Sequence, residues 1–296
     1  MGWLRSGWLL LMPGLAWGSV APECVGLPRP DNYNEQVQQD FQANYFALVS
    51  SLSPLHGGVP NRPGRGSIGL DVGVIPPLGC SRRYVLDWTK TEDTNKSPIL
   101  PRIRAMFSFP AIAKKVVPYA GVAVLPPVPV GGTRNLVVSA EGGVGVLAHE
   151  HVEPGVRMHT SIMRTYGDIA TAFNPDDPAI DDVYVGATWG IDAIVGFPVE
   201  VDETRLTPYI SAGYLDASTF FLVGDSRFVA NNFHPYAGFT GSVGLDALVW
   251  DRFRVAGEFF AAPGGYSKPD PSVASVTPAA RYGHLFTARI FLGVEL

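Results

Sequence analysis

Nine charged or titratable residues could do chemistry together, because each falls on the polar face of a segment in which every second residue is apolar. They are Asp71, Arg104, Arg157, His159, Asp192, Asp246, Arg254, Glu258 and Arg289. If the apolar faces point outward, these side chains line a common interior, where pairing offsets the loss of hydration. Arg254 and Glu258 fall on the strand beside Arg289, so they are its expected partners. Such a lining is either a selective polar passage or a closed, salt-bridged interior.

Two other clusters carry side chains that can bind metal ions. Residues 149–153 (HEHVE) combine imidazole and carboxylate groups, which are ligands for zinc and other transition metals. Their histidines are two apart, without the helical HExxH spacing, so we expect a solvated acidic turn. Residues 174–177 (NPDD) offer oxygen ligands suited to calcium, but they lack the spacing of a calcium-binding loop. We expect no metal and no cofactor.

The C-terminal segment, residues 282–296, shows the alternation most clearly. Counted back from Leu296 to Phe286, every second residue is apolar. A strand of about ten or more residues exceeds the usual globular length and can cross a bilayer when tilted. The segment resembles the C-terminal sorting strand of Gram-negative outer-membrane β-barrel proteins, although it ends in Leu296 where that family usually has an aromatic residue. The resemblance implies insertion into outer-membrane lipid by the barrel-assembly machinery.

The composition also favours a membrane protein that spans with strands. Charged residues make up 17% of the chain, against about a quarter in soluble domains. No apolar run after the N-terminus is long enough for a spanning helix, whereas a barrel needs only every second residue to be apolar. The net charge of -5 and the scattered basic residues argue against nucleic acid as a partner.

The N-terminal part divides into a leader and a segment that precedes the barrel. Residues 1–20 have the layout of a cleavable signal peptide, which exports the chain to an oxidising compartment. There Cys24 and Cys80 form a disulfide or remain two free thiols. Residues 21–64 form a periplasmic or plug segment, in which helical spacing predicts a helix over 32–53 that begins at the cap residues Asp31 and Asn32. This helix plugs the lumen, lies on the periplasmic side or packs as a leader.

Residues 65–296 are predicted to form the barrel, after a loop rich in glycine and proline at 56–66. The strand segments lie at roughly 66–75, 101–109, 116–126, 134–147, 155–167, 182–197, 205–221, 235–249, 252–262 and 281–296. Long extracellular loops must alternate with short periplasmic turns, and the joins in the second half of the chain do so. This alternation places Asp270 outside the cell and Asp251 in the periplasm.

Two further resemblances bear on function. In having a helix before a barrel, the chain is similar to the outer-membrane long-chain fatty-acid transporters, but it lacks their Asn-Pro-Ala motif, so none of their binding residues is carried over. Outer-membrane lipid hydrolases resemble the chain in being barrels, and they use a serine and a histidine on the lipid-facing side. Here His159 and Ser161 share the face predicted to line the lumen, and a G-x-S-x-G motif is absent. We assign no catalytic residue.

The sequence therefore predicts an all-β fold, an antiparallel up-and-down transmembrane β-barrel in the outer membrane with a short N-terminal helix. It has about ten strands, or twelve if residues 84–90 add a strand. The expected function is that of a small channel or transport protein for small or hydrophobic solutes, not an enzyme. The alternatives are a closed structural or adhesion-type barrel that acts through its extracellular loops, and an outer-membrane lipid-modifying hydrolase.

Overall fold

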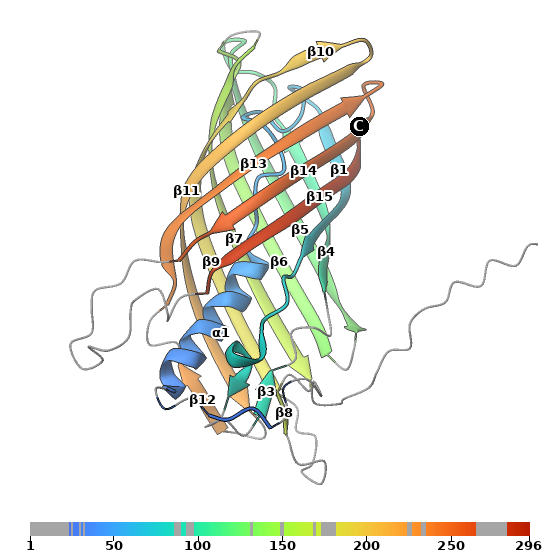
Figure 1. Cartoon of the computed structure of the whole chain (residues 1–296). Helices are drawn as coiled ribbons and strands as arrows, with labels where there is room; N and C mark the ends of the chain where they lie inside the picture. Colours follow the sequence, from blue (N-terminus) through green and yellow to red (C-terminus); the bar gives the residue numbers. More distant parts are fainter. Residues whose placement is uncertain are drawn as a thin grey trace, which may run out of the picture.

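Ten antiparallel strands close into a barrel in the computed structural model (Figure 1). The structure describes residues 24, 26–29, 31, 33–85, 90–92, 98–130, 133–148, 151–167, 170–172, 182–223, 227–231, 235–264 and 283–296. The barrel strands are β1 (Gly66–Val74), β4 (Ile99–Ser108), β5 (Val116–Val130), β6 (Thr133–Val146), β7 (Glu153–Gly167), β9 (Asp182–Gly196), β11 (Thr204–Val223), β13 (Ala237–Val249), β14 (Phe253–Ala262) and β15 (Leu285–Glu295). Each predicted segment is one of these strands, so the predicted fold class is confirmed.

The barrel closes where its first strand meets its last. β1 pairs with β15, with Leu70 opposite Leu292. On the other side of β1, Leu70 lies opposite Ile103 of β4. Because closure pairs the first strand with the last, the wall exposes no open edge that could add strands from other chains.

Five short strands are not counted among the ten: three form a separate sheet, and two extend the sheet of the wall by pairing with β11. β2 (Tyr84–Val85), β3 (Lys90–Glu92) and β8 (Ala170–Ala172) form a separate three-stranded sheet. β10 (Val199–Val201) and β12 (Arg227–Asn231) pair with parts of β11. The alternative of twelve barrel strands is therefore wrong, because residues 84–85 and 90 enter the small sheet and not the wall.

The two ends of the barrel differ in their connections. At the end where Leu296 lies, tight turns join the strands, such as the turn at Trp250 and Asp251 between β13 and β14. We term this the short-turn end. Most joins at the opposite, long-loop end are longer, and residues 263–284 connect β14 to β15 there. β5 and β6 are an exception at the long-loop end, since only residues 131–132 separate them.

The outer face of the wall is apolar. Aliphatic side chains exposed along the middle of the strands include Ile68, Leu70, Ile103, Val122, Val138, Val156, Ile162, Ile191, Ile210, Val243, Val255, Ile290 and Leu292. Toward the short-turn end the outward aromatic residues are Phe107, Phe109, Phe197, Trp250 and Phe253, and toward the long-loop end they are Trp189, Tyr214, Phe239, Phe259 and Phe286. An aliphatic band thus runs between two sets of aromatic residues.

The chain before β1 fills the interior. Helix α1 (Glu35–Ser50) lies inside the wall at the long-loop end, and the residues after it rise through the barrel toward the short-turn end (Figure 1). Residues 51–61 are all buried. We term residues 51–61 the lumen segment, and α1 with the lumen segment the plug. No helix among the described residues has the length and apolarity needed to cross a membrane.

The sequence misplaced two features of the plug. The helix begins at Glu35 and is capped by Asn34, whose side chain accepts a hydrogen bond from the Val37 amide at 3.1 Å, so the predicted caps at Asp31 and Asn32 are wrong. The predicted loop before β1 has no regular secondary structure, as expected, but its first half, residues 56–61, is buried within the lumen, which the sequence did not indicate. The structure places the helix inside the barrel, the first of the three positions considered.

A disulfide fastens the outer end of the plug. Cys24 and Cys80 are bonded, which confirms this prediction, and the bond ties the chain before α1 to the connection between β1 and β4. Gln38 and Gln42 of α1 donate to main-chain carbonyls of the same connection, those of Ser81 and Arg82. The predicted signal peptide, residues 1–20, lies outside the described residues.

Candidate functional site: the plugged lumen

The structure places all nine predicted lumen residues inside the barrel, each with its side chain buried: Asp71, Arg104, Arg157, His159, Asp192, Asp246, Arg254, Glu258 and Arg289. Sequence reasoning missed Arg102 and Glu141, which are buried among them. The same period of two could have identified both residues. Arg102 precedes Arg104 by two positions, and Glu141 occupies the inward phase of β6.

Arg102 and Arg289 hold the start of the lumen segment by its main chain. Arg102 Nη1 donates to the carbonyl oxygens of Ser50 at 3.1 Å and Ser51 at 3.2 Å, while its Nη2 donates to Asp71 at 2.8 Å. Arg289 Nη1 donates to the same Ser51 carbonyl at 2.7 Å. Two wall strands, β4 and β15, therefore converge on the residue that follows α1.

Arg157 and Arg104 bind the next three carbonyls in turn. Arg157 Nη2 donates to Leu52 O at 2.6 Å. Arg104 donates to Ser53 O at 3.0 Å and to Pro54 O at 2.8 Å. Together with Arg102 and Arg289, these arginines satisfy the carbonyls of five consecutive residues, 50–54. Hydrogen bonds from a charged donor are the stronger kind, so this array fixes the extended chain firmly.

Wall carboxylates join the arginines into a network. Glu141 accepts from Arg104 Nη2 at 2.5 Å through one oxygen and from Arg157 Nη1 at 2.7 Å through the other. Arg157 also donates to Asp192 through Nε at 2.8 Å. Arg104, Arg157, Glu141 and Asp192 thus each have an opposite charge beside them, which is the condition under which ions are tolerated away from water.

The expected partnership of Arg254 and Glu258 with Arg289 is wrong. Arg254 makes a two-pronged pair with Asp246, with distances of 2.9 and 2.7 Å. Glu258 does lie directly across from Arg289 in the pairing of β14 with β15. Among the described residues, however, no carboxylate oxygen lies within the 4.0 Å ion-pairing distance of Arg289.

The plug explains why that cross-strand pair does not form. Glu258 Oε2 accepts from the Leu55 amide at 3.2 Å and from the Tyr209 hydroxyl at 2.9 Å. Arg289 instead donates to the plug and lies over the ring of Phe260, with 4.5 Å from its guanidinium carbon to the ring centroid. The lumen segment therefore provides a hydrogen-bond partner for Glu258 and another for Arg289, although the strand register alone would have paired these two side chains with each other.

Glycines let the lumen segment pass close to the wall at the short-turn end. A Cβ atom on Gly58 would overlap the main chain of Glu153 and Pro154, and one on Gly155 would come within 2.5 Å of the Gly58 carbonyl oxygen. A Cβ on Gly145 would collide with the same carbonyl. Only residues without a side chain permit this approach of two backbones.

Arg62 directly follows the plug and anchors its end at the short-turn rim. Its Nε donates to Glu295 at 2.7 Å, and its Nη1 lies 2.8 Å from a carboxylate oxygen of Asp251. The hydrogen bond to Glu295 raises the pKa of the Arg62 guanidinium above its ordinary value. Just inside, the Asn61 amide donates to Ser108 Oγ at 3.1 Å. The exit of the plug is thus tied to β15, to β4 and to the turn before β14.

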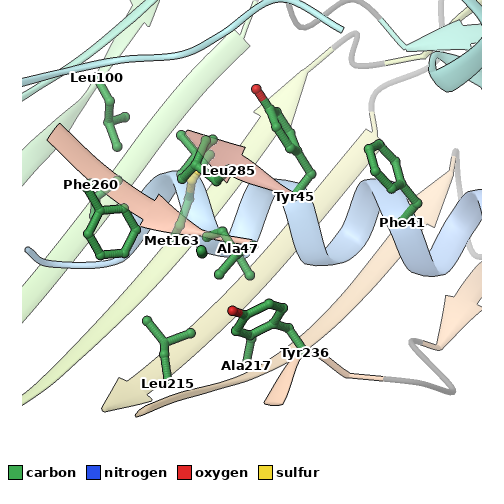
Figure 2. Packing of buried hydrophobic residues seen from close by; sticks show 14 residues of the cluster. Phe41, Tyr45, Ala47, Leu100, Met163, Leu215, Ala217, Tyr236, Phe260 and Leu285 are labelled. Atoms are coloured by element: carbon green, nitrogen blue, oxygen red, sulfur yellow. The ribbon is translucent and has the colours of Figure 1, made fainter. Parts of the chain in front are cut away.

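The helical half of the plug is surrounded by apolar side chains instead. Phe41, Tyr45 and Ala47 of α1 point toward residues of the inner wall (Figure 2). The wall residues of this cluster labelled in the figure are Leu100, Met163, Leu215, Ala217, Phe260 and Leu285. Asn44 adds a polar contact by accepting from the Tyr236 amide at 2.8 Å. The lumen is therefore apolar at the long-loop end and charged at mid-height.

The residues considered for hydrolysis and metal binding do not form a site among the described residues. His159 Nε2 lies 3.3 Å from Asp192, whereas Ser161 Oγ is 2.6 Å from Ser139 Oγ. In the described part of the chain, no group of three or more His, Cys, Asp or Glu side chains could hold a metal ion. Of the predicted clusters, residues 149–150 and 174–177 lie outside the described residues, as does Asp270.

Comparisons with known proteins give little beyond this geometry. No protein-family model matches the chain, and no curated protein matches it. Among solved structures, the chain is similar to the P. putida toluene transporter TodX at 12% sequence identity and a TM-score of 0.31. That match covers 83% of this chain and 69% of the transporter chain.

Proposed function

We propose that this protein is an outer-membrane β-barrel that acts as a small channel or transport protein, with a lumen closed by its own plug. The outer face supports a membrane location. An exposed apolar surface of this extent marks contact with lipid or another apolar partner, and aromatic residues at both borders are typical of barrels that span a bilayer. By this proposal the long-loop end faces the outside of the cell.

The observation that carries the channel proposal is the path of the lumen segment. Residues 51–61 cross the interior from α1 to the short-turn rim and are buried throughout. Wall side chains can fill the interior of a barrel of about eight strands, whereas a wider barrel encloses a ligand cavity or channel. Here a separate stretch of chain occupies that space, and it is bound by hydrogen bonds that water or a solute could replace.

The second candidate is a closed structural barrel, and the ion-pair network favours it. Glu141 bridges Arg104 and Arg157, so movement of any member leaves a buried charge without its partner. A network of this kind resists opening. In that case the extracellular loops would carry the function, and the plug would be a permanent part of the core.

Current across a planar bilayer separates the two candidates. In Gly58→Leu the new side chain has no room beside Glu153, so we expect the lumen segment to leave its place and the variant to conduct in discrete steps. Gly79→Leu is the matched control, because a Cβ there meets no atom within 4 Å. Folding of each protein is checked by a gel mobility that changes on boiling. Steps in Gly58→Leu alone support the channel, and silence in folded Gly58→Leu supports the closed barrel.

Chemical labelling tests the orientation. In a background with both cysteines replaced by serine, Pro263→Cys at the long-loop end is expected to react with an impermeant maleimide on whole cells, and Asp251→Cys is expected to be protected. Both positions are exposed in the structure, so folding does not hide either one. Equal labelling of the two cysteines would contradict the proposed topology.

A further inference from the structure

We infer that the lumen is a binding site for the main chain of a peptide, and that the lumen segment occupies this site as an internal ligand. The inference rests on the proposed function, since it names the class of solute that the channel or transporter would take. It follows from what the wall binds in the plug. The wall binds the main-chain carbonyls of five consecutive residues, and it also contacts the side chains of Leu55, His56 and Asn61.

The wall donates to consecutive carbonyl oxygens. Arginine N–H groups reach the carbonyls of residues 50, 51, 52, 53 and 54 without a gap. Two serine side chains of this stretch contribute little to binding by the wall. Ser51 Oγ lies 3.4 Å from Arg289 Nη2, and Ser53 Oγ has no hydrogen-bond partner within the described part of the chain. Every peptide presents such carbonyls, so this part of the site accepts many sequences.

The wall also offers acceptors for main-chain N–H groups. Glu258 accepts from the Leu55 amide, and Ser108 accepts from the Asn61 amide. Glu258 Oε1 and Asp71 Oδ1 are buried acceptors without a hydrogen-bond partner among the described residues. Buried polar groups are normally satisfied, so these two oxygens point to a ligand with further donors. Acyl chains and polyethers lack N–H donors, whereas a peptide provides donors and acceptors in alternation.

The site also selects among side chains. His56 Nε2 lies 3.7 Å from Glu141 Oε2, and the Asn61 side chain accepts a hydrogen bond from Arg254 Nη1 at 3.0 Å. Leu55 packs in a small apolar pocket against Ala256 and Phe291. Three residues later, Gly58 passes where the wall leaves no room for a Cβ atom. The preferred ligand is therefore a peptide with an aliphatic residue at the position of Leu55 and a very small residue three positions later, at the position of Gly58.

The test uses the full chain cut at one place. The exposed turn at 63–65 receives a protease recognition sequence, and Cys24 and Cys80 are replaced by serine, so that cleavage leaves the plug held without a covalent bond. A fluorescent synthetic peptide with the sequence of residues 48–61 is added in excess. We expect saturable binding by fluorescence anisotropy in the cleaved protein, and none in the uncleaved control, where the tethered plug competes.

Variant peptides distinguish recognition of the main chain from recognition of side chains. A peptide with alanine in place of Ser51 and Ser53 is expected to bind within about threefold of the original, because these side chains contribute at most one weak hydrogen bond. A peptide with leucine in place of Gly58 is expected to bind at least about tenfold more weakly, because the added side chain would overlap the main chain of Glu153.

Three results would overturn the inference: no bound label after long incubation, loss of binding in the alanine peptide, or displacement of the labelled peptide by a medium-chain fatty acid. The absence of bound label overturns the inference even if the cleaved plug stays in place, because a binding site for a transported solute must exchange its occupant. Peptide exchange without bilayer current would contradict the channel and leave the peptide site standing. Bilayer current without peptide exchange would contradict the peptide site and leave the channel standing.

Discussion

The two halves of the plug are held by different chemistry. α1 contributes Phe41, Tyr45 and Leu48 to an apolar cluster, and the disulfide fastens the chain in front of it. The lumen segment is held by charged hydrogen bonds to its main chain. Apolar packing depends on the shapes of the side chains, whereas carbonyl recognition does not. The packing of the helix is therefore specific to this barrel, whereas the lumen segment occupies a site that other chains can share.

The largest effect is expected from Arg104→Met. This change leaves one oxygen of Glu141 without its arginine partner and removes two hydrogen bonds to the lumen segment, and breaking a buried pair costs about 3–5 kcal/mol. Urea unfolding of the detergent-solubilised protein measures the loss. Arg134→Met is the control, because Arg134 is exposed on β6. The rate of amide hydrogen exchange should rise more in residues 51–55 than in α1. An equal rise would contradict the claim that the two halves of the plug are held by different interactions.

Loss of the disulfide should act on the other half. Replacing Cys24 and Cys80 by serine removes a cross-link that spans 56 residues, and removal of such a bond costs about 2–5 kcal/mol. The expected result is faster hydrogen exchange in α1 while the amides of Leu55 and Asn61 stay protected. Faster exchange confined to the lumen segment would contradict the assignment of the disulfide to the helical half.

Gly58→Ala tests the close approach of the lumen segment to the wall. A single methyl group would overlap the main chain of Glu153, so we expect a loss of about 1–3 kcal/mol in unfolding free energy. Gly79→Ala, which meets no neighbour, should change stability little. If both variants unfold at the same urea concentration, the lumen segment does not pass the wall as closely as described.

The smallest effect is expected at the helix cap. Asn34→Ala removes the side-chain acceptor for the Val37 amide, and loss of an N-cap costs about 1 kcal/mol. Asn34→Asp keeps an acceptor and should restore most of the stability measured by urea unfolding. Bilayer current should be unchanged in both variants, because the cap does not touch the lumen segment. A conducting Asn34→Ala protein would show that the helical half alone closes the barrel.

Much of the barrel could be predicted because its wall repeats one physical rule. Each strand separates an apolar outer face from an inner face, so a period of two located the strands, and the side chains it assigned inward, such as Asp71 and Arg157, are buried. Arg102 and Glu141 obey the same rule and were overlooked. The disulfide was foreseeable because the chain has only two cysteines and its N-terminal segment predicts export.

The plug path and the ion-pair partners could not be read in the same way. Residues 51–61 have no periodicity, and their glycines and prolines indicate a loop when the wall around them is unknown. Their partners are distant in sequence, as Arg289 and Ser51 show. Glu258 and Arg289 face each other across two strands, but each forms a hydrogen bond with the main chain of the lumen segment.

Single-channel current through the protein with cleavable residues 63–65 and serines at positions 24 and 80 tests the central claim most directly. The same purified sample is recorded in a planar bilayer before and after cleavage, and its gel mobility shows that the barrel stays folded. We predict silence before cleavage and discrete conductance steps once the plug has dissociated. Silence after the plug has left a folded barrel would contradict the claim that the plug is what closes the lumen.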